Sequence, residues 1–177
     1  MTTSNLPDIG IVSTAEIDGL SIRYARSGTS TGIPILLTAP WPESLYSFYH
    51  LAPLLAAGHP VILVDLPGFG HSQSRPDVMA PEAMGDFFVK LLRHFGITRA
   101  HTVTPDVGTL AALFAASKHP ELFESMVVGG AAMRADLAAG ALKYLMNSPV
   151  GYLVEGGPEG IKPYLDQAAS LTPSAVI

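Results

Sequence analysis

The chain has 177 residues, which is enough for one domain with a buried core. Its net charge is −5 and it contains no basic cluster, so nucleic acid is not an expected partner. The absence of cysteine excludes disulfides and thiolate metal sites and fits a cytoplasmic protein, and no apolar run approaches the ~18 residues of a membrane span.

The apolar content is high for a chain without a membrane span. Hydrophobic residues make up 48% of the chain, and the mean hydropathy is +0.33. Two explanations fit this excess equally well. The chain contains a strongly buried, parallel-type sheet, or it is a piece of a larger fold whose core face lacks its partner.

The first part of the chain predicts strands. Residues 1–14 are rich in Ser, Thr and Pro and are expected to form a loose lead-in. Residues 16–24 alternate around a glycine turn, which is typical of a β-hairpin. The short apolar runs at 33–37 and 60–65 have the pattern of strands that are buried on both faces.

Helices and strands then alternate. Residues 45–57 and 81–95 carry apolar side chains at helical spacing, and a small-residue helix is expected over 107–118. Further strands are expected at 99–103 and 123–128. This order predicts an α/β fold with a mostly parallel sheet, right-handed crossovers and flanking helices. Beyond it, short helices without a further strand are expected.

One strand-to-helix junction has the pattern of a nucleophile elbow. The usual form is G-x-S-x-G, in which a sharp turn exposes the central side chain. Here Asp106 takes the central position, Gly108 closes the turn, and Thr104 replaces the leading glycine. A carboxylate at this position would attack carbon directly and form an ester on the enzyme. The alternative is an ordinary turn aspartate that caps the following helix.

Three segments in order resemble the α/β-hydrolase family, and within it the epoxide hydrolase and haloalkane dehalogenase branch. Residues 37–44 are similar to the H-G-x-P loop, although Ala39-Pro40 replaces its His-Gly pair. Residues 65–72 are similar to the D-x-P-G-x-G-x-S turn, and residues 104–108 to the elbow with aspartate. The resemblance therefore implies the α/β-hydrolase fold.

The resemblance also implies roles for individual residues. Asp106 would be the nucleophile, and the backbone N–H groups of Trp41 and Val107 would form the oxyanion hole. The Trp41 ring would line the substrate pocket, and a cis peptide before Pro42 would fix its loop. Val107 stands where haloalkane dehalogenases usually carry a halide-binding tryptophan, so epoxide hydrolysis is favoured over dehalogenation.

Three tyrosines in the last part of the chain, Tyr144, Tyr152 and Tyr164, fall in the segment that resembles the start of a helical cap. Epoxide hydrolases use tyrosines of this cap to hydrogen-bond the epoxide oxygen. Each is therefore a candidate for that role or a packing residue of the cap, and Tyr144 and Tyr152 are the expected substrate-binding residues.

The expected organisation is a lead-in at 1–14, the N-terminal part of the hydrolase core at 15–132, and an incomplete cap at 133–177. No histidine follows His119, whereas the family places its catalytic histidine and acid after the cap. Three interpretations therefore stay open: a partial hydrolase, a non-catalytic ligand-binding or interaction module, and a chain completed by another chain.

The expected partner is a small apolar substrate, and a homodimer is possible. We expect neither a cofactor nor a metal site, because the chain has no H-x-x-H motif and no carboxylate cluster.

Overall fold

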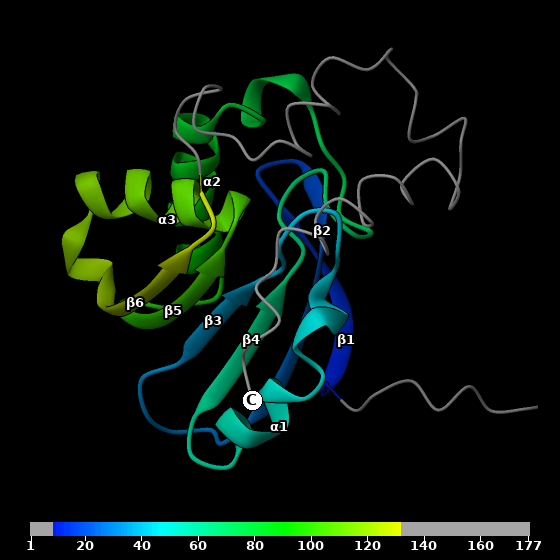
Figure 1. Ribbon diagram of the computed structural model, residues 1–177, viewed down its shortest axis with the longest axis vertical. Coiled ribbons are helices and arrows are strands. Elements are labelled where there is room, and N and C mark those ends of the chain that lie inside the picture. Colours follow the sequence, from blue (N-terminus) through cyan, green and yellow to red (C-terminus); the bar gives the residue numbers. More distant parts are fainter. Residues whose placement is uncertain (1–8, 132–177) are drawn as a thin grey trace, which may run out of the picture. The chain divides into compact units, whose positions relative to one another are not determined.

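The computed structural model describes residues 9–131, which form a six-stranded mixed sheet with helices on both faces (Figure 1). The expected cap at 133–177, with Tyr144 and Tyr152, lies outside these residues. The strand order is β1-β2-β4-β3-β5-β6, in which β2 pairs antiparallel with β1 and β4, and the remaining neighbours are parallel. The mostly parallel α/β sheet that the sequence predicts is confirmed. The strands are β1 (Ile11–Ile17), β2 (Leu20–Gly28), β3 (Ile35–Thr38), β4 (Pro60–Val64), β5 (Ala100–Pro105) and β6 (Phe123–Gly129).

The first strand begins earlier than the sequence predicts. A loose lead-in was expected up to residue 14, but β1 starts at Ile11, and its first four residues pair with residues 23–26 of β2. Asp18 and Gly19 form the hairpin turn, both with positive φ. The antiparallel pairing supplies hydrogen bonds that the polar composition of the lead-in does not reveal, so this part of the expected boundary is wrong.

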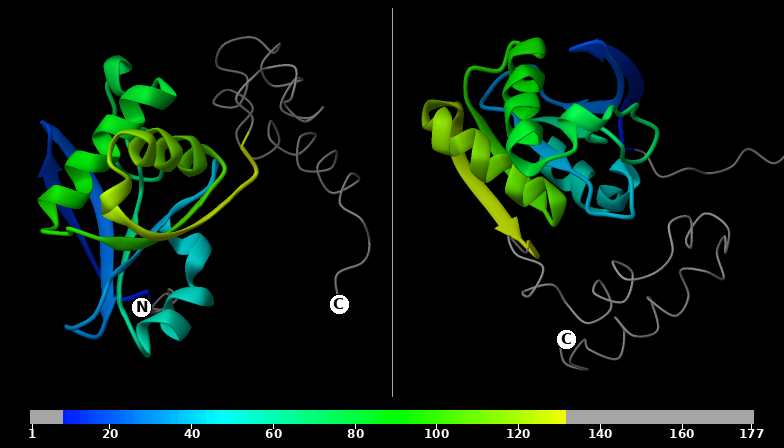
Figure 2. Two further views of the ribbon diagram at one scale, coloured as in Figure 1. Left: turned by 90° about the vertical axis from the view of Figure 1, so that its left-hand side faces the viewer. Right: turned by 90° about the horizontal axis from the view of Figure 1, so that it is seen from above.

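The helices form two layers, one on each face of the sheet (Figure 2). One face is covered by α2 (Pro81–His94) and α3 (Val107–Lys118), and the other by α1 (Leu51–Ala56) together with the 3₁₀ helix η1 (Leu45–Phe48). Two further short 3₁₀ helices, η2 (Pro76–Val78) and η3 (Pro120–Leu122), lie in connections.

The single helix expected over 45–57 is interrupted. The Tyr49 N–H donates to Tyr46 O at 3.1 Å, which closes a 3₁₀ turn, and the α-helix starts only at Leu51. Pro53 explains the break, because it has no N–H and could not donate to the carbonyl of Tyr49 in a continuous helix. In α1 it occupies the first turn, where no intrahelical donor is required.

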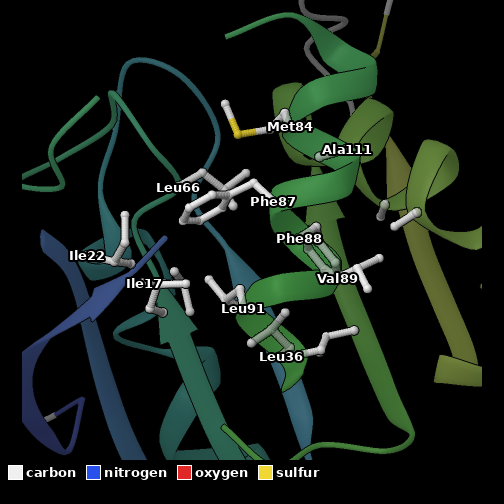
Figure 3. Close-up of a cluster of buried hydrophobic side chains, with 14 of the residues drawn as sticks. Ile17, Ile22, Leu36, Leu66, Met84, Phe87, Phe88, Val89, Leu91 and Ala111 are labelled. Atoms are coloured by element: carbon white, nitrogen blue, oxygen red, sulfur yellow. The ribbon is translucent and has the colours of Figure 1, made fainter. Parts of the chain in front are cut away.

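The core between α2 and the sheet consists of buried hydrophobic side chains (Figure 3). Phe87, Phe88 and Leu91 of α2 are at most 1% exposed and pack in one cluster with Ile22 and Leu36 of the strands. The amphipathic pattern of 81–95 therefore produces the expected helix, because its apolar side faces the sheet. This packing fixes the distance between the helical layer and the strands that carry the site.

The chain order of the strands creates a switch point between β3 and β5. From β3 the chain continues to β4 on one side, and β5 returns to the other side of β3. In open α/β sheets, ligands bind in the crevice outside the carboxyl ends of the strands at such a point. The two segments that follow β3 and β5 contain Trp41 and Asp106.

Candidate active site

Asp106 occupies a constrained turn between β5 and α3. Its φ is 53° and its ψ is −122°, a conformation that non-glycine residues seldom adopt. Two backbone hydrogen bonds hold it there: Asp106 N–H donates to Gly129 O at 2.7 Å, and Thr109 N–H donates to Asp106 O at 3.0 Å. Such a residue costs about 1–3 kcal/mol and persists only when its surroundings fix it.

Trp41 approaches Asp106 from the loop that follows β3. Its backbone N–H donates to the Oδ2 atom of Asp106 at 2.8 Å, across 65 residues of sequence. The Trp41–Pro42 peptide is cis, as the sequence analysis expects. The structure thus brings together the residue expected at the centre of the elbow and the residue expected to donate to an oxyanion.

The glycine that closes the turn is required by close packing. A Cβ atom on Gly108 would lie 2.1 Å from Thr38 Oγ1 and 3.3 Å from Thr104 Cβ. Both threonines are fully buried. Gly108 therefore lets the first turn of α3 approach β3 and β5, and it makes room for Thr104 at the position where the motif usually has its first glycine.

Val107, the other expected oxyanion donor, is the first residue of α3. It is half-buried, and none of the described residues accepts a hydrogen bond from its backbone N–H. The first N–H groups of a helix have no intrahelical acceptor. This N–H is therefore available to an acceptor at the same end of α3 as Asp106.

The hydroxyl of Thr109 is a part of the site that the sequence analysis did not identify. Thr109 is 4% exposed, and its Oγ1 lies 2.5 Å from Thr104 O and 3.0 Å from Gly129 O. The same oxygen accepts the Gly129 N–H at 3.0 Å. A threonine in a helical pattern gives no signal for these contacts, because they depend on β6 lying beside β5.

Asp65 directly follows β4 and connects three segments of the chain by hydrogen bonds. Its side chain is fully buried and accepts from Arg23 Nε at 2.6 Å, from Leu45 N at 2.7 Å and from His71 N at 3.1 Å. A Cβ atom on Gly70 would lie 2.1 Å from its Oδ2 atom. Asp65 thus holds the 65–72 turn against β2 and fixes the start of η1, which follows the Trp41 loop.

The neighbouring polar residues have smaller roles. Glu43 is exposed, and its N–H donates to Pro40 O at 2.8 Å in the turn of the loop. Ser44 occupies the position before η1, but its side chain makes no capping hydrogen bond. The His71 side chain is exposed, and its backbone N–H contacts Asp65 rather than Asp106.

A cavity of about 730 Å³ lies at the other edge of the sheet. It is lined by residues at the amino ends of β3, β4 and β5, together with Arg26 and Phe95. Because Asp106 lies at the carboxyl end of β5, this cavity is separate from the candidate site. Within residues 9–131 there is no helix that could cross a membrane and no group of three or more possible metal ligands.

Sequence comparison places the chain in one protein family. The sequence profile of the alpha/beta hydrolase fold family matches residues 33–150, which is more than half of the chain. A soluble epoxide hydrolase of Corynebacterium sp. (strain C12) is 28% identical over 114 residues, covering 64% of this chain and 39% of that protein. A haloalkane dehalogenase of Psychrobacter cryohalolentis is 29% identical over 136 residues, covering 71% of this chain and 45% of that protein. The chain therefore spans less than half the length of these relatives.

Structure comparison agrees with this result. An alpha/beta hydrolase fold protein from Burkholderia ambifaria superposes with a TM-score of 0.71 at 21% sequence identity, covering 89% of this chain and 57% of that structure. At this identity the likeness shows the fold alone. Profile, relatives and fold together show that the chain belongs to the α/β hydrolase fold family.

Proposed function

We propose that this chain carries the nucleophile of a hydrolase that opens small apolar epoxides, with Asp106 as the attacking residue. The observation that carries the proposal is the hydrogen bond from Trp41 N–H to Asp106 Oδ2 at 2.8 Å. In a serine-type elbow the oxyanion donors must face an oxygen of the substrate. With an aspartate nucleophile, the oxygen that becomes negative belongs to the aspartate itself.

The chemistry follows from this arrangement in two steps. Asp106 Oδ1 attacks one epoxide carbon, a C–O ester bond forms, the ring C–O bond breaks, and the ring oxygen takes a proton from water. In the second step a base removes a proton from another water, which attacks Cγ of the ester, and negative charge develops on Oδ2. The Cγ–Oδ1 bond then breaks, the diol leaves with Oδ1 and a proton, and the water oxygen stays in the carboxylate. The Trp41 N–H already points at Oδ2, and the Val107 N–H is a second candidate donor.

The second step needs a base that removes a proton from the attacking water. Among the described residues no histidine contacts Asp106, so the proposal places this base outside residues 9–131. Tyr144 and Tyr152 are proposed substrate-binding residues that would hydrogen-bond the epoxide oxygen. Loss of a member of such a catalytic set typically costs ~10⁴-fold in rate or more, so we expect the 177-residue chain to form an ester without turnover.

Val107 favours an epoxide over a haloalkane. Halide release from carbon needs a hydrogen-bond donor for the leaving anion, and a valine side chain has none. An epoxide opens without releasing an anion into the site, since its oxygen stays attached to the product. The identities with a soluble epoxide hydrolase and with a haloalkane dehalogenase are nearly equal, at 28% and 29%, so the preference rests on residue 107.

The test uses 1,2-epoxyhexane and intact-protein mass spectrometry. We expect one adduct with the mass of the epoxide, mapped to Asp106 by peptide sequencing and absent from Asp106→Ala. Asp77→Ala, which removes an exposed carboxylate, serves as the matched control and should label like the wild type. Stable, non-labelling protein would support a non-catalytic binding module, and faster labelling by 1-bromohexane would support a dehalogenase. Multiple turnovers by this chain would contradict the expectation that it forms the ester but lacks the base that hydrolyses it.

A further inference from the structure

We infer that Thr109 is a positioning residue for Asp106: its hydroxyl holds the ends of β5 and β6 together so that the Asp106 carboxylate meets the Trp41 N–H. The inference rests on the proposed function, in which that contact prepares the nucleophile. It assigns a role to a side chain that touches neither the substrate nor the reacting atoms.

A sequence of three hydrogen bonds connects Thr109 to Trp41. The Gly129 N–H donates to Thr109 Oγ1 at 3.0 Å, and the Gly129 carbonyl accepts the Asp106 N–H at 2.7 Å. Asp106 Oδ2 in turn accepts the Trp41 N–H at 2.8 Å. A shift of Gly129 therefore moves the backbone of Asp106 directly, and with it the carboxylate.

The hydroxyl also holds the other side of the turn. Thr109 Oγ1 lies 2.5 Å from Thr104 O, two residues before Asp106 in β5, and 3.0 Å from Gly129 O. A hydroxyl has one proton, so it donates to one of these carbonyls at a time, and the shorter distance favours Thr104. Thr109, in the first turn of α3, thus contacts both β5 and β6 next to Asp106, whose φ is 53°.

Removal of the hydroxyl should release the turn without emptying space. Thr109→Val keeps the shape but removes the hydroxyl that contacts the carbonyl of Thr104, a fully buried residue, and that accepts the N–H of Gly129, an exposed residue. The N–H can turn to water, whereas a buried carbonyl that loses its donor needs water or another donor, which requires backbone movement. Because Asp106 already adopts an unfavourable conformation, the turn has a lower-energy geometry to relax into.

The first test measures the contact itself. Trp41 is the only tryptophan, so protein labelled with ¹⁵N-tryptophan gives one backbone amide signal. Asp106→Ala defines the chemical shift of the amide without the carboxylate. We expect Thr109→Val to move the Trp41 amide most of the way toward that value and Thr109→Ser to restore the wild-type position. Thr102→Val is the matched control, since this buried hydroxyl makes no hydrogen bond among the described residues.

The second test measures reactivity of the same variants with 1,2-epoxyhexane. We expect the maximal rate of Asp106 labelling to fall at least about tenfold in Thr109→Val, with little change in the epoxide concentration that gives half that rate. Thr109→Ser should recover the rate, and Thr102→Val should match the wild type. Circular dichroism confirms that each variant is folded at the assay temperature.

The outcomes separate this inference from the proposed function. If the wild type labels at Asp106 and folded Thr109→Val gives the same amide shift and rate, the positioning role is wrong. If the wild type does not label but the Trp41 amide still responds to Thr109, the positioning geometry stands and the proposed nucleophile fails. A Thr109→Ser variant that behaves like Thr109→Val would also overturn the inference, because it retains the hydroxyl.

Discussion

Replacement of Asp65 by asparagine should strongly destabilise the protein, although the two side chains have nearly the same shape. The carboxylate accepts three hydrogen bonds: Leu45 N–H reaches Oδ1, whereas Arg23 Nε–H and His71 N–H both reach Oδ2. An asparagine amide can place its oxygen on only one of these two sides. The better orientation keeps the Oδ2 side and turns the NH₂ group toward Leu45 N–H, so that two donors face each other.

The magnitude follows from burial. The Asp65 side chain is fully buried and that of Arg23 is 12% exposed. When Asp65 loses its charge, little water can therefore reach the Arg23 guanidinium to solvate it. Removal of one partner from a buried ion pair costs about 3–5 kcal/mol. The unpaired Leu45 N–H alone costs about 1–3 kcal/mol. Asparagine keeps part of the hydrogen bonding, so we expect the free energy of unfolding to fall by at least about 3 kcal/mol in Asp65→Asn. Asp65→Ala should lie at the upper end of the range for a broken ion pair.

Urea unfolding, followed by circular dichroism and by the fluorescence of the single tryptophan, measures this loss. Asp77→Asn is the matched control, because that carboxylate is 67% exposed and pairs with Arg75 at the surface. It should stay within about 0.5 kcal/mol of the wild type. An Asp65→Asn variant that unfolds within about 1 kcal/mol of the wild type would refute the reasoning, since both the ion pair and the orphaned N–H would then be unimportant.

Three further predictions concern packing, pH dependence and association. Gly108→Ala should destabilise by about 1–3 kcal/mol in urea unfolding, because its Cβ would lie 2.1 Å from Thr38 Oγ1, and Thr38→Ala should recover part of the loss; an unchanged midpoint would contradict this. Hydrogen bonds from Lys90, and then from Arg75, hold the pKa of Asp18 below its usual 3.8, so its stabilisation is complete above that pH and is lost as the pH falls through the lowered pKa. Asp18→Asn should therefore lower thermal stability at pH 6, and the difference should vanish in strong acid; a constant difference would exclude the linkage. Val127 is 60% exposed on β6, at an edge of the described sheet, so Val127→Lys should reduce self-association in sedimentation, unless the wild-type chain is already monomeric at micromolar concentration.

The sequence alone determined the order and type of most elements. The apolar run at 60–65 predicts a strand buried on both faces, and the amphipathic pattern of 81–95 predicts a helix with one buried face. The structure has β4 and α2 at these positions. The proximity of Trp41 and Asp106 was also predictable, because both follow parallel strands and the carboxyl ends of such strands meet at one edge. The helix break before Leu51 was readable in principle from Pro53, whose missing N–H is a local property.

Only the tertiary structure decided which distant groups bond to one another. Asp65 meets Arg23 because β4 lies beside β2, and Thr109 meets Gly129 because β6 lies beside β5. Likewise, Ile11 belongs to a strand only because β2 supplies its partner. A local pattern reports burial and turn geometry, which depend on a residue and its near neighbours in sequence. Hydrogen-bond partners across a sheet depend on strand order and register, which are fixed only when the whole core packs.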